Sequence, residues 1–283
     1  MANIIIDAHA KINLSLDVLT RREDGYHELK MIMQQIALKD IITIEDRDTD
    51  VIIESNNNDI PLDSSNLVYK AYRLLADMYN IKKGIYIHIQ KNIPVAAGLA
   101  GGSTDAAAVL KGLNQLWNIN MPQKELMDIG VKIGADVPYC LMGGTVLAEG
   151  IGEKLTELRS FSDKLILLAN PDIPVSTAHV FKSLKLNDIL VHPDTESLLK
   201  SVYNDDINFL AKNMANVLET ITIKEHPILN DIKQHMLEYG ALGSLMSGSG
   251  PTVFGIFKNE YDIQKCKDSL SNRIKTVIMT KTV

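Results

Sequence analysis

The chain has 283 residues, which fits one large domain or two ordinary ones. Apolar residues make up 46% and charged residues 23%, values that exclude a disordered or low-complexity chain. The formal charge is −6 and no dense Lys/Arg block is present, so nucleic acid is not an expected partner.

No segment approaches the roughly 18 consecutive apolar residues needed to span a bilayer, and residues 1–7 do not have the pattern of a signal peptide. We therefore expect a cytoplasmic protein with no membrane partner. Cys140 and Cys266 form no CxxC motif, and the histidines form no HxH or HExxH pattern, so neither a disulfide framework nor a hydrolytic zinc site is indicated.

The first half of the chain is predicted to be mixed β with few helices. Residues 10–18 alternate apolar and polar side chains, which predicts a half-buried strand. The Asp-Gly pair at residues 24–25 is typical of a hairpin turn, and this turn presents Tyr26 and His27. Further strands are expected at residues 29–38, 41–45, 51–54 and 84–91, and helices at residues 67–79 (with Ser64 and Ser65 as capping residues), 105–117 and 123–133.

A polar stretch before a buried strand at residues 165–169 indicates a domain boundary. We place it near residue 160, which gives an N-terminal domain of residues 1–160 and a C-terminal domain of residues 161–283. The second half is expected to be a helix-on-sheet α+β layer. Its helical patterns lie at residues 176–184, 196–203, 207–218, 228–239 and 261–270, and its strands at residues 242–246, 252–257 and 276–281.

The segment from Pro94 to Thr104 lies between a predicted strand and a predicted helix and is rich in small residues. Small residues let a ligand approach the backbone, and the free N–H groups at the start of a helix bind anionic phosphates. The segment matches neither the Walker A loop nor GxGxxG. A loop that only permits tight packing of strand against helix is the alternative. The residues of this segment, which the resemblance described below assigns to ATP binding, are Pro94, Val95, Ala96, Ala97, Gly98, Leu99, Ala100, Gly101, Gly102, Ser103 and Thr104.

A second glycine segment, Ser247-Gly248-Ser249-Gly250, joins two predicted strands and is followed by a proline. Four consecutive small residues exceed what a plain hairpin requires, although a flexible turn remains the alternative. Because the first loop is present as well, the better explanation is that this segment forms a wall of the same phosphate-binding or substrate-binding cleft.

Phosphoryl transfer also needs positive charge near the transferred group, a metal ion and a group that accepts the proton of the attacking hydroxyl. Lys11, on the polar face of the first strand, and Asp136, in a short Gly-Ala-Asp-Val-Pro segment, are the candidates. The alternatives are a solvated surface lysine and an aspartate that caps a helix or turn.

Five segments, taken in this order, resemble the GHMP kinase superfamily over essentially the whole chain. They are Ala10-Lys11-Ile12-Asn13-Leu14, Asp24-Gly25-Tyr26-His27-Glu28, residues 94–104, Ala135-Asp136-Val137-Pro138 and residues 247–251. The resemblance implies a two-domain α+β GHMP kinase fold. Its N-terminal domain would be like the second domain of ribosomal protein S5, and its C-terminal domain would be ferredoxin-like.

Within the superfamily, the segments are most similar to kinases that phosphorylate 4-diphosphocytidyl-2-C-methyl-D-erythritol on its 2-hydroxyl, in non-mevalonate isoprenoid biosynthesis. The resemblance implies ATP as the phosphoryl donor, with Mg²⁺, and gives the 2-phosphate and ADP as products. It also implies that Lys11 holds the hydroxyl and favours its ionised form, while Asp136 takes its proton. The Mg²⁺ ligands are not defined, and the chain is expected to be a monomer or a homodimer.

The same resemblance implies roles for other side chains. Ser103 or Thr104 would supply a hydroxyl near the metal, and Asn13 would contact the substrate. Tyr26 and His27 would face the cytidine, where an aromatic ring stacks and an imidazole bonds the base edge. Phe181 is the candidate for the opposite stacking face, with a helix core residue as the alternative. Ala96, Ala97 and Ala100 stand where some relatives are richer in glycine.

Two other functions remain open from the sequence. One is a GHMP kinase for another small alcohol, such as mevalonate or homoserine, but a hairpin with Tyr26 and His27 would then be unexplained. The other is a non-catalytic nucleotide-binding sensor on the same fold. The presence of both Lys11 and Asp136 argues against a sensor, because a sensor needs no proton acceptor.

Overall fold

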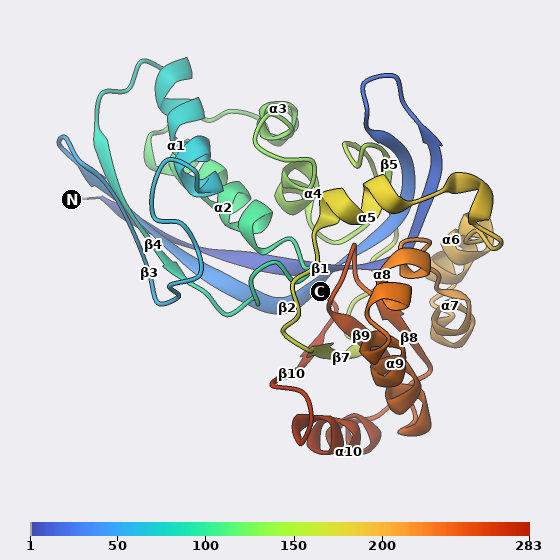
Figure 1. Ribbon diagram of the computed structural model, residues 1–283. Helices are drawn as coiled ribbons and strands as arrows, with labels where there is room; N and C mark the ends of the chain where they lie inside the picture. The colour runs from blue at the N-terminus through green and yellow to red at the C-terminus, as the bar shows by residue number, and fades with distance from the viewer. Residues whose placement is uncertain (1) are drawn as a thin grey trace. The chain divides into compact units, whose positions relative to one another are not determined.

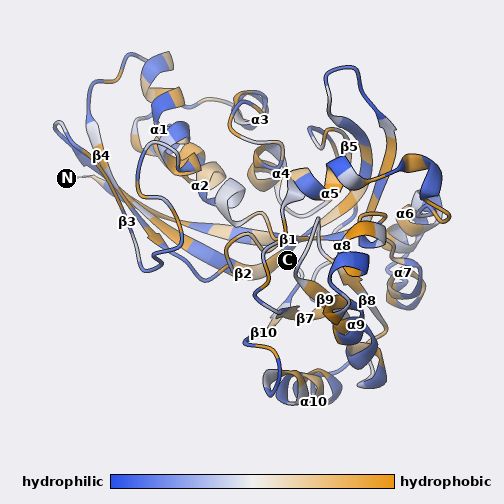
Figure 2. Cartoon of the chain, viewed as in Figure 1, coloured by the Kyte–Doolittle hydropathy of each residue, from blue (hydrophilic) through white to orange (hydrophobic). Residues whose placement is uncertain are grey.

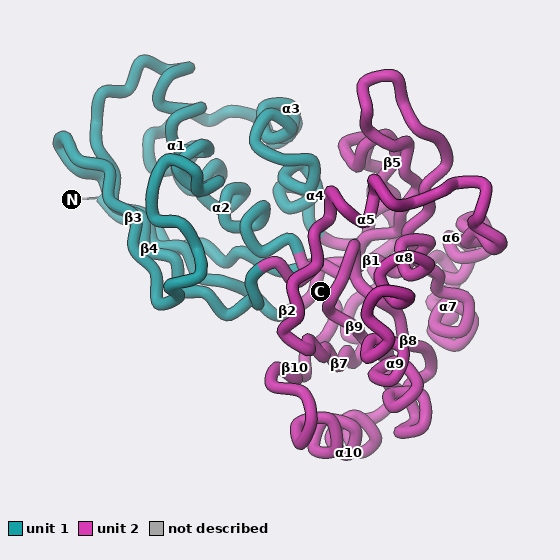
Figure 3. The backbone as a smooth tube through the Cα atoms, viewed as in Figure 1, with its two compact units in different colours: residues 1–10, 38–95, 100–143 teal, residues 11–37, 96–99, 144–283 magenta. Residues whose placement is uncertain are grey.

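The computed structural model describes residues 2–283 (Figure 1). The chain forms two compact units that interleave along the sequence (Figure 3). Unit 1 consists of residues 1–10, 38–95 and 100–143, and unit 2 of residues 11–37, 96–99 and 144–283. This division by contacts is not a single cut of the chain, so the domain boundary near residue 160 stays a prediction.

Two long strands account for the interleaving. β1 (Asn3–Arg21) and β2 (His27–Arg47) pair with each other, and each passes from one unit into the other. The turn between them covers residues 22–26, so the predicted hairpin is confirmed. The two strands expected at residues 29–38 and 41–45 are one strand, because the polar residues that interrupt the apolar pattern, Lys39 and Asp40, remain in extended backbone.

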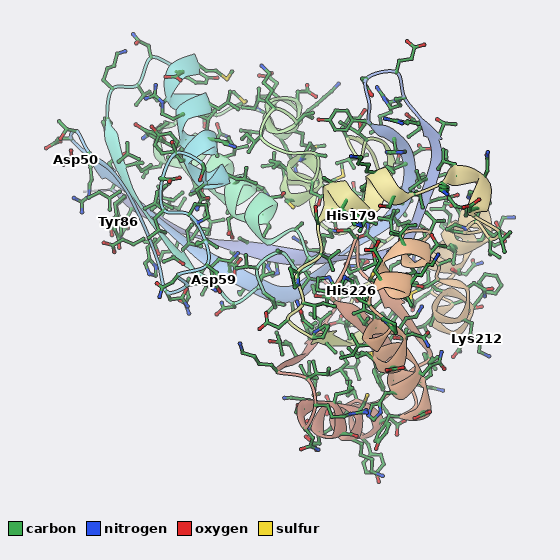
Figure 4. All side chains as sticks on the ribbon, in the orientation of Figure 1. Asp50, Asp59, Tyr86, His179, Lys212 and His226 are labelled. Atoms are coloured by element: carbon green, nitrogen blue, oxygen red, sulfur yellow. The ribbon has the colours of Figure 1, made fainter. Side chains whose placement is uncertain are left out.

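In unit 1, part of the first sheet carries the helices. β3 (Val51–Ser55) runs parallel to β4 (Gly84–Gln90), which pairs antiparallel with residues 41–47 of β2. Tyr86 of β4, labelled in Figure 4, donates to Glu54 of β3 at 2.8 Å. The helices of this unit are α1 (Leu67–Met78), α2 (Gly101–Leu116), α3 (Gln123–Gly130) and α4 (Val137–Met142).

Helix α2 packs directly on the sheet of unit 1 (Figure 1). A Cβ atom at Gly112 would lie 2.5 Å from Ile44 Cδ1, so glycine at this position permits the close approach. The helix begins at Gly101 and not at Asp105 as predicted, because glycine, serine and threonine are weak helix formers and hid its first turn. Helix α1 is capped by Asn66, whose side chain accepts the N–H of Val68, so the expected caps Ser64 and Ser65 are wrong.

In unit 2, the first sheet continues with β5 (Thr145–Gly150), which pairs with residues 29–34 of β2, and with β6 (Lys154–Glu157). A second sheet has the antiparallel order β10-β7-β9-β8. Its strands are β7 (Leu165–Asn170), β8 (Gly243–Met246), β9 (Val253–Phe257) and β10 (Thr276–Lys281), and the helices packed on it are α9 (Ile228–Glu238) and α10 (Glu260–Ser271).

The strand order of this second sheet is that of the ferredoxin-like βαββαβ fold, so the predicted C-terminal architecture is confirmed. Figure 2 shows strand β9 in the colour of apolar residues and much of helix α10 in that of polar ones. All five residues of β9 are buried, whereas α10 buries only one side, through Ile263, Cys266 and Leu270.

The short helices of unit 2 come between β7 and α9 along the sequence. They are α5 (Thr177–Ser183), the 3₁₀ helix η1 (Leu186–Asp188), α6 (Thr195–Tyr203), α7 (Ile207–Asn213) and α8 (Glu219–Glu225). The helix predicted at residues 207–218 ends early, at Asn213. The cause is tertiary: Asn216 forms a β-bridge with Leu16 of β1, whose backbone donates to Ala215 and accepts from Val217, both at 3.0 Å.

The expectation of a half-buried first strand is wrong. The polar residues of β1 in unit 2 are as covered as the apolar ones: Lys11, Asn13, Ser15 and Asp17 are between 0% and 4% exposed. Alternation identified the two faces of the strand, but not the segments of unit 2 that cover the polar face. Within residues 2–283, no helix is long and apolar enough to cross a membrane.

Candidate active site

Lys11 is a buried cation held by an amide. Its Nζ donates to Asn13 Oδ1 at 2.7 Å, and Asn13 Nδ2 lies 3.5 Å from Met31 Sδ. Among the described residues of unit 2, no carboxylate lies within ion-pair distance of Lys11. A buried ammonium without a counter-ion is costly, so this position favours an anionic partner that the unit itself does not supply. The alternative of a solvated surface lysine is wrong.

The two glycine loops meet at Lys11. The Lys11 N–H donates to the Leu99 carbonyl at 3.2 Å, and Ser247 Oγ donates to the Gly98 carbonyl at 2.9 Å. A Cβ at Gly98 would lie 2.3 Å from the Ser247 carbonyl, and one at Gly248 would lie 3.4 Å from Lys11 Nζ. Both glycines also have positive φ, +74° and +57°. The backbone at Gly98 therefore approaches the second loop more closely than any larger residue allows, while Gly248 lies at contact distance from the lysine.

The second loop is buried and braced by side chains that the sequence did not single out. Asn216 Nδ2 donates to the carbonyls of Met246 and Gly248, at 2.9 and 2.7 Å. Thr222 Oγ1 donates to the Ser249 carbonyl at 3.1 Å. No local pattern marks Asn216 or Thr222, because each acts through a partner at least 27 residues away. The loop is fixed in place, so the flexible-turn alternative is not supported.

Helix α5 is tied to the second loop. The hydroxyls of Thr177 and Ser249 lie 2.7 Å apart, and His179, labelled in Figure 4, bonds Glu225 of α8 at 3.0 Å. Val180 is the buried residue of this short helix, while Phe181 is only half buried. Phe181 is therefore not its core residue.

The ring of Phe181 stacks on His27, with 5.4 Å between centroids and 30° between planes. Burial, and to a smaller extent Arg21, lowers the pKa of His27, so its imidazole is neutral at pH 7 and able both to donate and to accept. Tyr26 is 58% exposed beside it. The three residues expected to face the cytidine thus include one ordered aromatic pair and one free aromatic side chain.

The first loop ends at the start of α2. Ala96 and Ala100 have the left-handed φ values +51° and +59°, and Ala100 is the N-cap residue without a side-chain cap bond. The first N–H groups of a helix have no partner within it, and no side chain caps them here. They are donors suited to phosphate oxygens.

Ser103 and Thr104 differ in what their hydroxyls do. Thr104 is 2% exposed and its Oγ1 donates to the His9 carbonyl at 2.8 Å. No hydrogen bond of the Ser103 hydroxyl occurs within residues 2–283. A Cβ at Gly134 would lie 3.8 Å from Ser103 Oγ, so the segment that carries Asp136 runs past this hydroxyl within unit 1.

Asp136 precedes α4, at the N-cap position, but its side chain makes no cap hydrogen bond. The half-buried carboxylate therefore accepts no hydrogen bond from the N–H groups of the helix, whereas a capping aspartate would accept one. No group of three or more His, Cys, Asp or Glu side chains able to hold a metal ion occurs in residues 2–283. The Ser103 hydroxyl is an oxygen that suits a Mg²⁺ taking most of its ligands from nucleotide phosphates and water.

Two family models match the chain. The model described as GHMP kinases N terminal domain matches residues 66–144, and the model described as GHMP kinases C terminal matches residues 198–276. Together they cover more than half of the chain.

Known proteins resemble the chain over its full length. The 4-diphosphocytidyl-2-C-methyl-D-erythritol kinase of Acetivibrio thermocellus is 54% identical over 283 residues, which is 100% of both chains. A crystal structure of 4-(cytidine 5′-diphospho)-2C-methyl-D-erythritol kinase superposes with a TM-score of 0.84 at 29% identity, covering 99% of both chains. A homoserine kinase from Cytophaga hutchinsonii has a TM-score of 0.81 over 100% of this chain and 95% of its own, but at 20% identity it shows the fold alone. The chain belongs to the GHMP kinases and, within them, to the family of 4-diphosphocytidyl-2-C-methyl-D-erythritol kinases.

Proposed function

We propose that this chain transfers the γ-phosphoryl group of ATP to the 2-hydroxyl of 4-diphosphocytidyl-2-C-methyl-D-erythritol. The hydroxyl oxygen forms a bond to the γ-phosphorus while its proton passes to a base. The bond from the γ-phosphorus to the β,γ-bridging oxygen breaks, and its electron pair leaves with ADP. The observation that carries the proposal is the buried, amide-held Lys11 at the meeting point of the two glycine loops.

Lys11 stabilises the negative charge that develops on the attacking oxygen and the transferred group. A fixed ammonium in a covered position stabilises such charge more than one in water, because little solvent screens it. Asn13 is a positioning residue: its Oδ1 fixes the direction of the ammonium, and its 1% exposure supports this role more than direct substrate contact.

Asp136 accepts the proton of the 2-hydroxyl. Its carboxylate is not engaged in capping α4, so it is available as a base. Ser103, with its unpartnered hydroxyl, binds the nucleotide phosphates in preference to Thr104. Mg²⁺, when bound, neutralises charge on the phosphates.

Tyr26, His27 and Phe181 recognise the cytosine base. A base held between two rings needs about 7 Å between them, twice the contact distance of carbon atoms. The 5.4 Å between His27 and Phe181 is shorter, so the base either covers one face of the pair or parts the two rings. Tyr26 offers a further exposed ring for stacking.

The test is ADP release by the purified chain with Mg²⁺ and ATP, comparing three acceptors: the cytidyl substrate, mevalonate and homoserine. Turnover confined to the cytidyl substrate is the expected result. Turnover with mevalonate or homoserine instead would contradict the proposed acceptor. ATP binding without turnover on any acceptor would favour a nucleotide sensor. The cytoplasmic location and the monomeric or homodimeric state expected from the sequence stay predictions.

A further inference from the structure

Three ionisable side chains of unit 1 form a buried cluster that has no part in the chemistry described above. Asp40 of β2, Lys91 after β4 and Asp105 of α2 have side chains that are 0%, 3% and 5% exposed. Lys91 Nζ donates to Asp40 Oδ2 at 2.5 Å and to Asp105 Oδ2 at 2.9 Å. One ammonium therefore joins two carboxylates that are 65 positions apart in the sequence.

The cluster holds both ends of the loop from Pro94 to Thr104. Lys91 precedes the loop, and the other oxygen of Asp40 accepts the N–H groups of Asn92 at 2.5 Å and of Ile93 at 2.8 Å. Asp105 directly follows the loop. The start of the loop is thus bonded to Asp40, the loop is followed by Asp105, and the Lys91 ammonium joins these two side chains.

The first residue of α2 packs on this ammonium. A Cβ at Gly101 would lie 3.1 Å from Lys91 Nζ and 3.3 Å from Ile93 Cγ2. Gly101 also begins the helical turn whose free N–H groups are the proposed donors to nucleotide phosphates. Any displacement of Lys91 or Asp105 therefore changes the place of these donors.

Stability alone does not account for the cluster. Burying charges costs free energy that their attraction only partly returns, and well-packed apolar residues often serve as well. Here the bonding is also incomplete, since Asp105 Oδ1 is buried without a hydrogen-bond partner among residues 2–283. Apolar packing would suffice for stability, but it is not directional. A role in positioning the loop explains why charged contacts, which are directional, occur here.

We propose that Asp40, Lys91 and Asp105 are positioning residues that hold the two ends of the ATP loop at the separation needed to bind nucleotide phosphates. The inference rests on one part of the proposed function, that this loop binds ATP. It does not depend on which alcohol accepts the phosphoryl group.

The experiment compares Asp105→Ala with Asp105→Asn in the full chain. The readout is the Kd of a non-hydrolysable ATP analogue with Mg²⁺, measured by calorimetry without acceptor. Asp105→Ala loses the bond to Lys91, so its Kd is expected to rise about tenfold. Asp105→Asn keeps an oxygen that accepts from Lys91, so its Kd is expected to stay within about twofold. Lys91→Met breaks both bonds and serves as a second loss variant.

Leu75→Ala is the matched control, because Leu75 of α1 is fully buried in the same unit and its apolar side chain makes none of the hydrogen bonds of the cluster. It should lower Tm and leave the Kd unchanged. If Asp105→Ala behaves in the same way, or if Asp105→Asn binds as weakly as Asp105→Ala, the positioning role is wrong. Normal nucleotide affinity with no turnover on any acceptor in the unaltered chain would contradict the proposed function and leave this inference intact.

Discussion

Lys11 and Asp136 share a property that ordinary charged residues of this chain do not have. Most buried or half-buried charges here are paired, as Lys91 is with Asp40 and Lys233 with Glu219. Lys11 instead has a neutral amide as its partner, and Asp136 makes no bond to the helix that it precedes. Groups whose bonding capacity is left unfilled by the protein are available to substrate atoms.

Asp136→Asn is expected to lower kcat by about 10²-fold or more, because the amide cannot accept the hydroxyl proton. Folding and the Kd for ATP should change little, since the carboxylate caps nothing. Steady-state ADP release and calorimetry measure the two quantities. Near-normal turnover of the variant would show that another group is the base.

The pH dependence of stability follows from Asp105. Burial raises the pKa of Asp105 from its ordinary value of 3.8 to about 8. The Lys91 ammonium lowers this pKa, but by less than burial raises it. Between these values the folded state binds more protons than the unfolded state, so the free energy of unfolding falls as the pH rises. The loss is at most about 1.4 kcal/mol per pH unit.

Asp105→Asn removes this titration. The free energy of unfolding of the variant, minus that of the unaltered chain, should therefore be larger at pH 8 than at pH 5. Urea denaturation at both pH values measures this difference. A difference between the two proteins that does not change with pH would show that Asp105 keeps an ordinary pKa in the folded state.

At the scale of elements, the loop from Pro94 to Thr104 shows what a sequence pattern predicts and what it does not. Small residues between a strand and a helix correctly indicated close backbone approach. They did not indicate that Gly98 meets Ser247, a contact across 149 positions. The local sequence also did not predict a buried role for Asp40, because a charged residue that interrupts an apolar strand is typical of the surface. Tertiary partners decide such roles, and periodicity carries no information about partners.

Gly98→Ala and Ala100→Gly should act in opposite directions. The alanine Cβ at position 98 would meet the Ser247 carbonyl, so we expect a loss of about 2 kcal/mol or more together with loss of turnover. Glycine at position 100 relieves the left-handed backbone of an alanine, with an expected gain of up to about 1 kcal/mol. Urea denaturation measures both. A stable, active Gly98→Ala variant would contradict the contact between the loops.

Helix α5 brings its own prediction. Phe181→Ala removes the ring that stacks on His27, so the KM for the cytidyl substrate should rise about tenfold while the KM for ATP stays unchanged. Phe209→Ala is the matched control, because Phe209 is 41% exposed on α7 in the same unit and has no aromatic partner among the described residues. Equal effects of the two variants would rule out a specific role for Phe181.

At the scale of the whole molecule, the residues of the proposed site belong to both units. Lys11, the Tyr26-His27 turn and the second glycine loop belong to unit 2, Asp136 belongs to unit 1, and the ATP loop has residues in each. The order of these segments along the chain was enough to predict the family and the ferredoxin-like sheet. The division into units was not predictable, because it depends on where two long strands pass from one unit to the other.

Thermal protection by nucleotides tests recognition of the base in the intact molecule. A ligand that binds only the folded state adds about 2.7 kcal/mol at a concentration of 100 Kd, which raises the Tm of a chain of this size by several degrees. We expect CDP to protect, UDP to protect less because it lacks the 4-amino group, and Phe181→Ala to lose protection by CDP but not by ADP. Protection by ADP with none by CDP in the unaltered chain would favour an acceptor without cytidine, because CDP carries the base that Tyr26, His27 and Phe181 are proposed to recognise.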